Sequence, residues 1–323
     1  MKYLFTILIL FSIACVKAQS TQKGISVHDP VMIKQDSIYY LFSTGNGIKV
    51  QSSKDLLSWK LERPVFATAQ TWAVESIPGF KGHIWAPDIS YHNNQYYLFY
   101  SVSTFGKNSS AIGVATNKTL NPSDSSFKWV DHGKVIESTP GKTHWNAIDP
   151  NVIIDDNGKP WMTFGSFWDG IKMVQLTKDL LSIDTSIYKI ETIASQKKKG
   201  QSGNNAIEAP FIFKKNDYYY LFASIDYCCK GEASTYKLIV GRSKNVQGPY
   251  FDQLNIPLAN GGGTILLAGN ENWHGIGHNA VYHIEGKDYL IFHGYDAKDN
   301  GKSKLRIEVL DWKDGWPNVR KQP

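Results

Sequence analysis

The stretch IEAPFIFKKNDYYYLFAS, residues 207–224, decides the fold. It runs from an acid and a proline through a short apolar segment and a polar turn into an aromatic segment, an order that is typical of a β-hairpin. Similar stretches stand at residues 28–45, 85–103, 148–166 and 278–296. The chain therefore repeats one hairpin unit roughly every 60 residues, and such a period in a strand-rich chain indicates a fold built by radial repetition.

One hairpin is only marginally stable in water, so each repeat needs further strands to bury its apolar residues. Two more strands per repeat give a four-stranded blade, and blades stacked round an axis bury their faces against one another. We therefore predict an all-β, five-bladed β-propeller, formed by a single domain at residues 19–323. The tail at residues 310–319 is predicted to complete a blade that the N-terminal segment begins, because a ring needs such a closure.

Equivalent positions of a radial repeat converge on its axis, so the residue before each anchor of the alignment is predicted to point into one shared cavity. The anchors are Pro30, Pro87, Pro150, Pro210 and Ala280. The axial residues are then Asp29, Ala86, Asp149, Ala209 with Glu208 beside it, and Asn279 with His278 beside it. A single carboxylate next to proline is more often part of a turn, but three at equivalent points favour a catalytic site.

Asp29, Asp149 and Glu208 offer what the cleavage of a glycosidic bond requires. One carboxyl group protonates the leaving oxygen, while a second activates water or attacks the carbon. A third carboxylate beside the acid raises the pKa of that acid by like-charge repulsion and keeps it protonated near neutral pH. These three residues therefore predict a glycoside hydrolase.

The motifs IWAPD, AIDPN, NNAIEAP, DYCCKG, GPY and GIGHNAV resemble those of the glycoside hydrolase family 43 endo-1,5-α-L-arabinanases, over nearly all of residues 19–323. The resemblance implies inverting hydrolysis of α-1,5-linked arabinofuranose in arabinan, the neutral side chain of pectin. By motif, Asp29 matches the general base, Glu208 the general acid, and Asp149 the residue that tunes the pKa of the acid. Base and acid carboxyls are then expected roughly 6.5–9.5 Å apart, with water between them.

Sugar-binding residues present flat apolar faces with hydrogen-bonding groups at their edges. By the same resemblance, Trp85 and Phe105 match positions that line the central sugar subsite. Further candidates are Asn146, Ser166 and Trp168, for which blade packing or a loop is the alternative role, and His28, which neighbours the expected base. The resemblance also implies one axial calcium ion, structural or electrostatic in role, held by His278 and water. Calcium prefers oxygen ligands, so a site with one imidazole is weak. The other histidines, including His83, His144, His274 and His293, carry no comparable expectation.

The first residues, MKYLFTILILFSIACVKA, are typical of a secretory signal peptide cleaved after Ala18. A transmembrane helix needs roughly 20 apolar residues, and this run is shorter. The protein is therefore expected to be secreted or periplasmic, with lipidation of Cys15 as the alternative. Since the chain ends soon after Trp316, no appended carbohydrate-binding domain is expected.

Cys228 and Cys229 are adjacent in the sequence. Neighbouring Cα atoms are about 3.8 Å apart, which is below the usual disulfide range of about 4.4–6.8 Å. Two free thiols are therefore favoured, with a vicinal disulfide as the alternative. Their spacing to histidine does not suit a zinc site.

A formal net charge of +6 without basic clusters argues against a nucleic-acid partner. The expected partner is arabinan or an arabino-oligosaccharide, bound by a monomer. Two alternatives stay open. One is an exo-acting arabinofuranosidase, exo-arabinanase or β-xylosidase on the same fold, and the other is a propeller that only binds polysaccharide.

Overall fold

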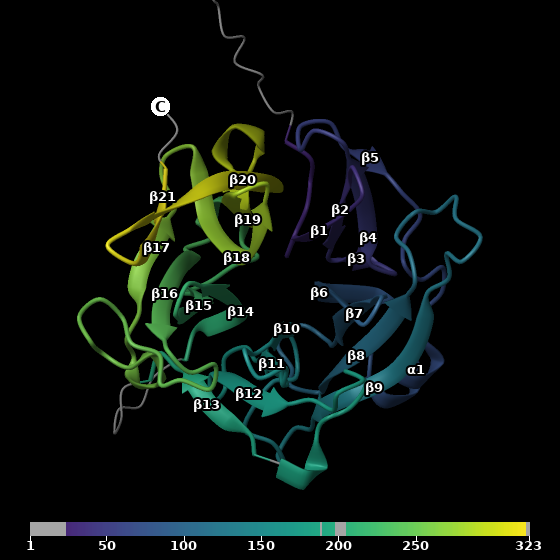
Figure 1. The fold of residues 1–323 in the computed structure, drawn as a ribbon, viewed down its shortest axis with the longest axis horizontal. Helices are drawn as coiled ribbons and strands as arrows, with labels where there is room; N and C mark the ends of the chain where they lie inside the picture. The colour runs from purple at the N-terminus through teal and green to yellow at the C-terminus, as the bar shows by residue number, and fades with distance from the viewer. Residues whose placement is uncertain (1–23, 188, 198–204, 321–323) are drawn as a thin grey trace, which may run out of the picture.

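The computed structural model describes residues 24–187, 189–197 and 205–320. The expected signal peptide at residues 1–18, with Cys15, lies outside these described residues. Five antiparallel sheets stand in a ring, and the first strand of each repeat lies nearest the central axis (Figure 1). This arrangement confirms the predicted five-bladed β-propeller. Within the described part, no helix has the length and apolar character needed to cross a membrane.

Each blade takes its principal strands from one continuous piece of chain. Blade 1 contains β1 (Val31–Gln35), β2 (Ile38–Ser43), β4 (Lys49–Ser53) and β5 (Lys60–Leu61). Blade 2 contains β6 (His83–His92), β7 (Gln95–Val102), β8 (Ser110–Asn117) and β9 (Val130–Ser138), with the short β3 (Gly45–Asn46) paired to β6. Blade 3 contains β10 (Asn151–Ile154), β11 (Pro160–Phe164), β12 (Ile171–Gln175) and β13 (Glu191–Ala194).

The last two blades follow the same plan. Blade 4 contains β14 (Ile207–Lys215), β15 (Tyr218–Ile225), β16 (Lys237–Ser243) and β17 (Thr264–Ala268). Blade 5 contains β18 (Trp273–Ile284), β19 (Lys287–Asp296), β20 (Lys302–Lys313) and β21 (Trp316–Val319). The connections hold one short helix, α1 (Thr71–Ser76), and the 3₁₀ turns η1 (Thr185–Ile187), η2 (Gly231–Ala233), η3 (Leu258–Asn260) and η4 (Ala297–Asp299).

The hydrophobic core lies between the blades, in clusters that each join two neighbours. Alternate residues of a strand face opposite sides of its sheet. In β7, Tyr96, Leu98 and Tyr100 therefore pack towards blade 1, whereas Tyr97 and Phe99 pack towards blade 3. Because both faces of such a strand are buried, its sequence is a continuous apolar run without polar alternation.

The ring closes differently from the prediction. The tail forms β21, the last strand of blade 5, whose named strands all come from residues 273–319. The N-terminal segment does not begin this blade, but it contacts it along β20, where Ser26 forms an isolated bridge with Lys304 and the Leu305 N–H donates to the Ile25 carbonyl at 3.0 Å. Both segments thus meet at blade 5, but the prediction was wrong in its strand order, because the last repeat supplies all the named strands of that blade.

Each blade carries, within or just before its innermost strand, a residue with left-handed backbone. These residues are Asp29, Ala86, Asp149, Ala209 and His278, with φ between 44° and 58°. Such φ values are uncommon outside glycine, and in three blades the pairing register shifts here as in a β-bulge. In blade 5 the axial residue is His278 rather than the predicted Asn279, because the anchor Ala280 was placed one residue late.

Side chains of the preceding blade accept the backbone N–H groups of four of these residues. The acceptors are Thr44 for Ala86, Ser101 for Asp149, Ser224 for His278 and His293 for Asp29, at 2.9–3.2 Å. In blade 3 the position equivalent to these acceptors is occupied by Gly165, which has no side chain. Asp149 Oδ2 accepts the Ala209 N–H there instead, at 3.1 Å. The axial residues are thus fixed by a ring of hydrogen bonds between blades.

Candidate active site

One cavity of about 1020 Å³ opens at the axis of the ring. Its lining includes every candidate that the sequence suggested: Asp29, Asp149, Glu208, Trp85, Phe105, Asn146, Ser166, Trp168, His28 and His278. The repeat alignment therefore identified residues from all five blades that share one space. Whether each residue has the predicted role is a separate matter, which depends on its contacts.

Asp29 is a buried carboxylate that receives several hydrogen bonds. Thr44 donates its hydroxyl to Oδ2 at 2.5 Å, and the Nδ1 atoms of His28 and His278 lie 2.8 Å and 3.0 Å from Oδ1. Burial alone would raise the pKa of Asp29, but the two imidazoles hold it well below its usual range. Asp29 is therefore ionised at neutral pH, as a general base must be.

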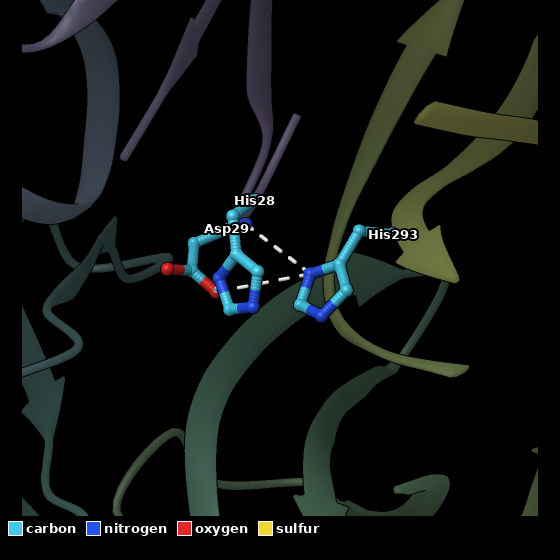
Figure 2. Close-up of side chains that lie close together, drawn as sticks. All are labelled: His28, Asp29 and His293. Carbon is cyan, nitrogen blue, oxygen red and sulfur yellow. Dashed lines mark hydrogen bonds and ion pairs between the residues drawn. The ribbon is translucent and has the colours of Figure 1, made fainter. Parts of the chain in front are cut away.

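His293 also supports Asp29, although no role was predicted for it. Its Nδ1 accepts the backbone N–H of Asp29 at 3.2 Å (Figure 2), and its ring stacks on that of His28 with centroids 4.0 Å apart. Burial lowers the pKa of His293 well below its ordinary value, so the ring stays neutral. Since Nδ1 accepts a hydrogen bond, its 3.7 Å approach to Asp29 Oδ1 is not an ion pair.

The cluster of His28, Asp29 and His293 has its ligand atoms within 4.8 Å of one another, close enough to hold a metal ion. Hydrogen bonds, however, already occupy the Nδ1 atoms of both histidines and Oδ1 of Asp29. An ion there would displace the contacts that hold the carboxylate. We therefore interpret this cluster as the support of a base rather than as a metal site.

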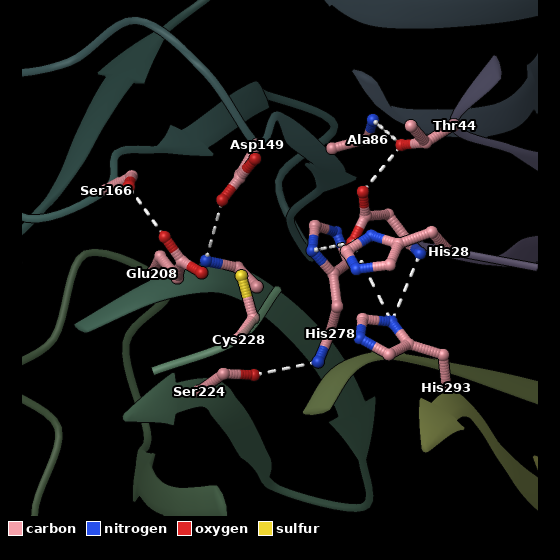
Figure 3. A network of polar contacts seen from close by, with 12 residues as sticks. His28, Thr44, Ala86, Asp149, Ser166, Glu208, Ser224, Cys228, His278 and His293 are labelled. Carbon is pink, nitrogen blue, oxygen red and sulfur yellow. Dashed lines mark hydrogen bonds and ion pairs between the residues drawn. The ribbon is translucent and has the colours of Figure 1, made fainter. Parts of the chain in front are cut away.

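Glu208 and Asp149 form the other half of the site. Ser166 donates its hydroxyl to Glu208 Oε2 and Tyr236 donates to Oε1, both at 2.7 Å. Burial raises the pKa of Asp149 to about 8; His278 opposes this rise, while the charges of Glu208 and Asp29 add to it. Asp149 is therefore a neutral carboxylic acid at pH 7. Figure 3 shows Asp149 and Glu208 on one side of the view and the histidines on the other.

The sugar-binding candidates occupy different depths of the cavity. Phe105 is 77% exposed at the rim, and Trp85 is half-buried on β6. Trp168 follows Phe167 in a turn where both residues have positive φ. Asn146 is buried, and its Oδ1 accepts the Ser110 hydroxyl at 2.6 Å.

Several functional contacts were missed by reasoning from the sequence. Thr44 and His293 follow the first and fifth axial residues by the same distance in the chain, so a better aligned repeat would have identified both. No comparable signal marks Tyr236, which lies between strands β15 and β16. Ser166 lines the cavity, where its predicted contact with sugar stays a prediction, and its hydroxyl donates to the carboxylate of Glu208.

Cys228 and Cys229 form a vicinal disulfide, so the favoured prediction of two free thiols was wrong. The argument from Cα spacing did not allow for the turn, in which Cys229 takes a left-handed φ of 66°. Both residues line the cavity, and Cys229 Sγ lies 3.8 Å from His28 Nε2. The disulfide therefore belongs to the wall of the candidate active site.

His278 has the arrangement expected of a metal-binding histidine. Its Nδ1 faces Asp29, while Nε2 has no hydrogen-bond partner among the residues that the structure describes, and the side chain lines the cavity. A carboxylate on one ring nitrogen commonly orients the other towards a metal ion. Burial lowers the pKa of His278, but Asp29 and then Asp149 raise it to about 9. His278 thus fits an ion completed by water, in competition with a proton.

A model of the glycosyl hydrolases family 43 matches residues 24–317. The chain belongs to this family. This family 43 chain is 49% identical over 314 residues to the extracellular exo-α-(1→5)-L-arabinofuranosidase of Cellvibrio japonicus, covering 95% of this chain and 90% of that protein. It is 43% identical over 296 residues to the extracellular endo-α-(1→5)-L-arabinanase 1 of Bacillus subtilis, covering 90% and 87%.

Solved structures of the family agree with the fold. The exo-1,5-α-L-arabinanase from a bovine ruminal metagenomic library has a TM-score of 0.90 at 49% identity, covering 93% of this chain and 98% of that one. The Cellvibrio cellulosa α-L-arabinanase complexed with arabinohexaose has a TM-score of 0.89 at 50% identity, covering 92% and 96%. This family 43 hydrolase therefore has relatives of both the exo and the endo kind.

Proposed function

We propose that this protein hydrolyses α-1,5-linked arabinofuranose in arabinan, with inversion, outside the cytoplasm. One observation carries the proposal: Asp29, which is ionised, and Asp149, which is neutral, line the same cavity as Glu208. An inverting glycosidase requires both a carboxylate base and a source of a proton. The names of the relatives supply the substrate, and two of them are called extracellular.

In the proposed reaction Asp29 removes a proton from water as the water attacks the anomeric carbon. Asp29 Oδ1 already receives two imidazole contacts and Oδ2 only one hydroxyl, so Oδ2 has the free lone pair for this proton. Glu208 protonates the departing sugar oxygen and is oriented for this by Ser166 and Tyr236. The charge of Glu208 raises the pKa of Asp149, so the two carboxyls hold one proton as a pair at neutral pH, and Glu208 passes it to the leaving oxygen.

A calcium ion is part of the proposal. It would be held by the Nε2 atom of His278 and by water, and it would supply positive charge near the carboxylates. The hydrogen bond between Nδ1 of His278 and Asp29 would orient the ring towards it.

The mode of attack is the finer part of the proposal. The sequence motifs predicted endo action, whereas the relatives with 49% identity or more include proteins named as exo-acting. The structure of the endo-arabinanase from Bacillus licheniformis has a lower TM-score, 0.82. Endo action follows from the motifs and exo action is the second candidate, but the likeness in sequence and structure favours the exo mode.

A product profile on linear α-1,5-arabinan tests both levels of the proposal. Mixed oligosaccharides at early times would establish endo action, and a single short product would establish exo action. Glu208→Gln and Asp29→Asn should each lose activity by at least about a thousandfold, since each removes an acid or a base. Glu285→Gln, which changes an exposed carboxylate, is the control. An unaltered protein that binds arabinan without releasing sugar would refute the hydrolase assignment.

A further inference from the structure

The hydroxyl of Tyr295 contacts two polar groups beside the base. Tyr295 is on β19 and is 4% exposed. Its oxygen accepts the backbone N–H of Cys229 at 2.7 Å and lies 2.8 Å from His28 Nε2.

A count of donors and acceptors fixes the proton positions in this group. A phenolic oxygen has one proton to donate and two lone pairs. Asp29 is ionised, so its Oδ1 only accepts, and the His28 Nδ1 that lies 2.8 Å from it carries the proton. In a neutral ring Nε2 is then an acceptor, and the Tyr295 hydroxyl, whose oxygen accepts the Cys229 N–H, donates its own proton to that Nε2.

The turn at residues 227–236 reaches both reacting carboxyls. At its start, the Cys229 N–H acts on Asp29 through Tyr295 and His28. At its end, Tyr236 donates directly to Glu208 at 2.7 Å. Backbone hydrogen bonds from residues 235 and 236 to the Tyr227 carbonyl close the turn, and the disulfide lies within it. One short segment thus connects the supports of the two groups.

We propose that Tyr295 is a positioning residue for the hydrolytic reaction. Through His28 it directs a proton at Asp29, and it ties the base to the disulfide turn that also holds Glu208. The turn thereby sets the relative placement of base and acid, on which an inverting reaction depends because water must fit between them. This inference rests on the proposed function for its kinetic consequence. The proton position on His28 does not depend on any substrate.

Tyr295→Phe tests the proposal, because it removes the hydroxyl and keeps the ring. We expect kcat on linear arabinan to fall by about tenfold to a hundredfold, the usual cost of misplacing a reacting group, with KM changed less than about twofold. Tyr250→Phe is the matched control, since Tyr250 is also buried and its hydroxyl also makes a hydrogen bond, far along blade 4. The proposal would be overturned if Tyr295→Phe and Tyr250→Phe had equal kcat values, or if Tyr295→Phe changed only KM.

A second measurement separates positioning from a general loss of structure. In protein labelled with ¹⁵N-histidine, the ring nitrogen signals of His28, assigned with His28→Gln, should show the Nδ1–H tautomer. In Tyr295→Phe the Nε2 signal should shift, because Nε2 loses the hydrogen bond that it accepts, while Nδ1 stays protonated against Asp29. An Nε2–H tautomer in the unaltered protein would refute the inference even if arabinan is hydrolysed. The expected tautomer in a protein without arabinanase activity would refute only the proposed function.

The disulfide provides a third test. Cys228→Ser/Cys229→Ser should lower kcat, because the turn then no longer fixes the N–H that Tyr295 accepts. Combined with Tyr295→Phe, the effects should be less than additive, since both changes interrupt one connection. Losses that multiply independently would show that the disulfide and Tyr295 do not act through the same path.

Discussion

Replacing Thr44 by valine tests whether the axial ring of hydrogen bonds stabilises both the fold and the base. Valine keeps the shape of threonine but lacks its hydroxyl. That hydroxyl donates to Asp29 Oδ2 at 2.5 Å and accepts the Ala86 N–H at 2.9 Å. A buried N–H left unpaired costs about 1–3 kcal/mol, and a donor lost from a carboxylate costs about 1.5–3 kcal/mol. We expect the free energy of unfolding to fall by about 3–5 kcal/mol.

Ser224→Ala is the matched comparison. The Ser224 hydroxyl accepts the His278 N–H at 2.9 Å and, among the described residues, makes no hydrogen bond with Asp29. Its loss should therefore cost only the first contribution, about 1–3 kcal/mol. The difference between the two variants measures what Thr44 contributes to the charged form of Asp29.

The difference between the variants should depend on pH with a definite sign. The pKa of Asp29 is held well below its usual value, so its stabilising contribution is complete above the ordinary aspartate pKa of about 3.9. The contribution is lost as the pH falls through the pKa of the folded protein. Urea unfolding of both variants at about pH 6 and about pH 3 checks this. Equal costs at pH 6, or a difference that does not shrink in acid, would refute the reasoning.

Three further predictions follow from the same geometry. Wild type should lose stability relative to Asp149→Asn as the pH rises from about 4 to about 8, because burial raises the pKa of Asp149 to about 8; parallel urea titrations measure this. A proton and a calcium ion compete for His278, whose pKa is raised to about 9, so calcium binding should weaken about tenfold for each pH unit below about 9 and release one proton. Calorimetry in two buffers measures the released proton, and calcium binding that releases none contradicts the prediction. Gly277→Ala should lower kcat and cost about 1–3 kcal/mol of stability, since its Cβ would stand 2.0 Å from the Tyr236 ring. Gly294→Ala, whose Cβ would come no nearer than 3.3 Å to a neighbour, is its control, and equal activity of the two would contradict the prediction.

The axial carboxylates could be predicted from the sequence because the fold repeats itself. The repeat places Asp29, Asp149 and Glu208 near one axis, and this placement does not depend on the lengths of the loops between the strands. Where the period slips by one residue, the prediction fails, as it did when Asn279 was placed at the position of His278. Local patterns therefore predict this fold well, and their errors are errors of register.

Other parts of the site have no periodic signal. Tyr236 reaches Glu208 from a turn of the same blade, and Tyr295 reaches that turn from the next blade. Such contacts depend on three-dimensional placement alone. The disulfide was missed for a different reason. Average Cα spacing argued against it, but a left-handed Cys229 allows a geometry that the average does not represent.

The closure of the ring between blade 1 and blade 5 has a consequence for biosynthesis. Asp29 is among the first residues of the propeller to leave the ribosome, whereas His278 and His293, which hold it, are among the last. A nascent or truncated chain therefore carries the base without its supports. The competent enzyme exists only after the final blade has been translated and has docked against the first, so completeness of the chain is a condition for catalysis.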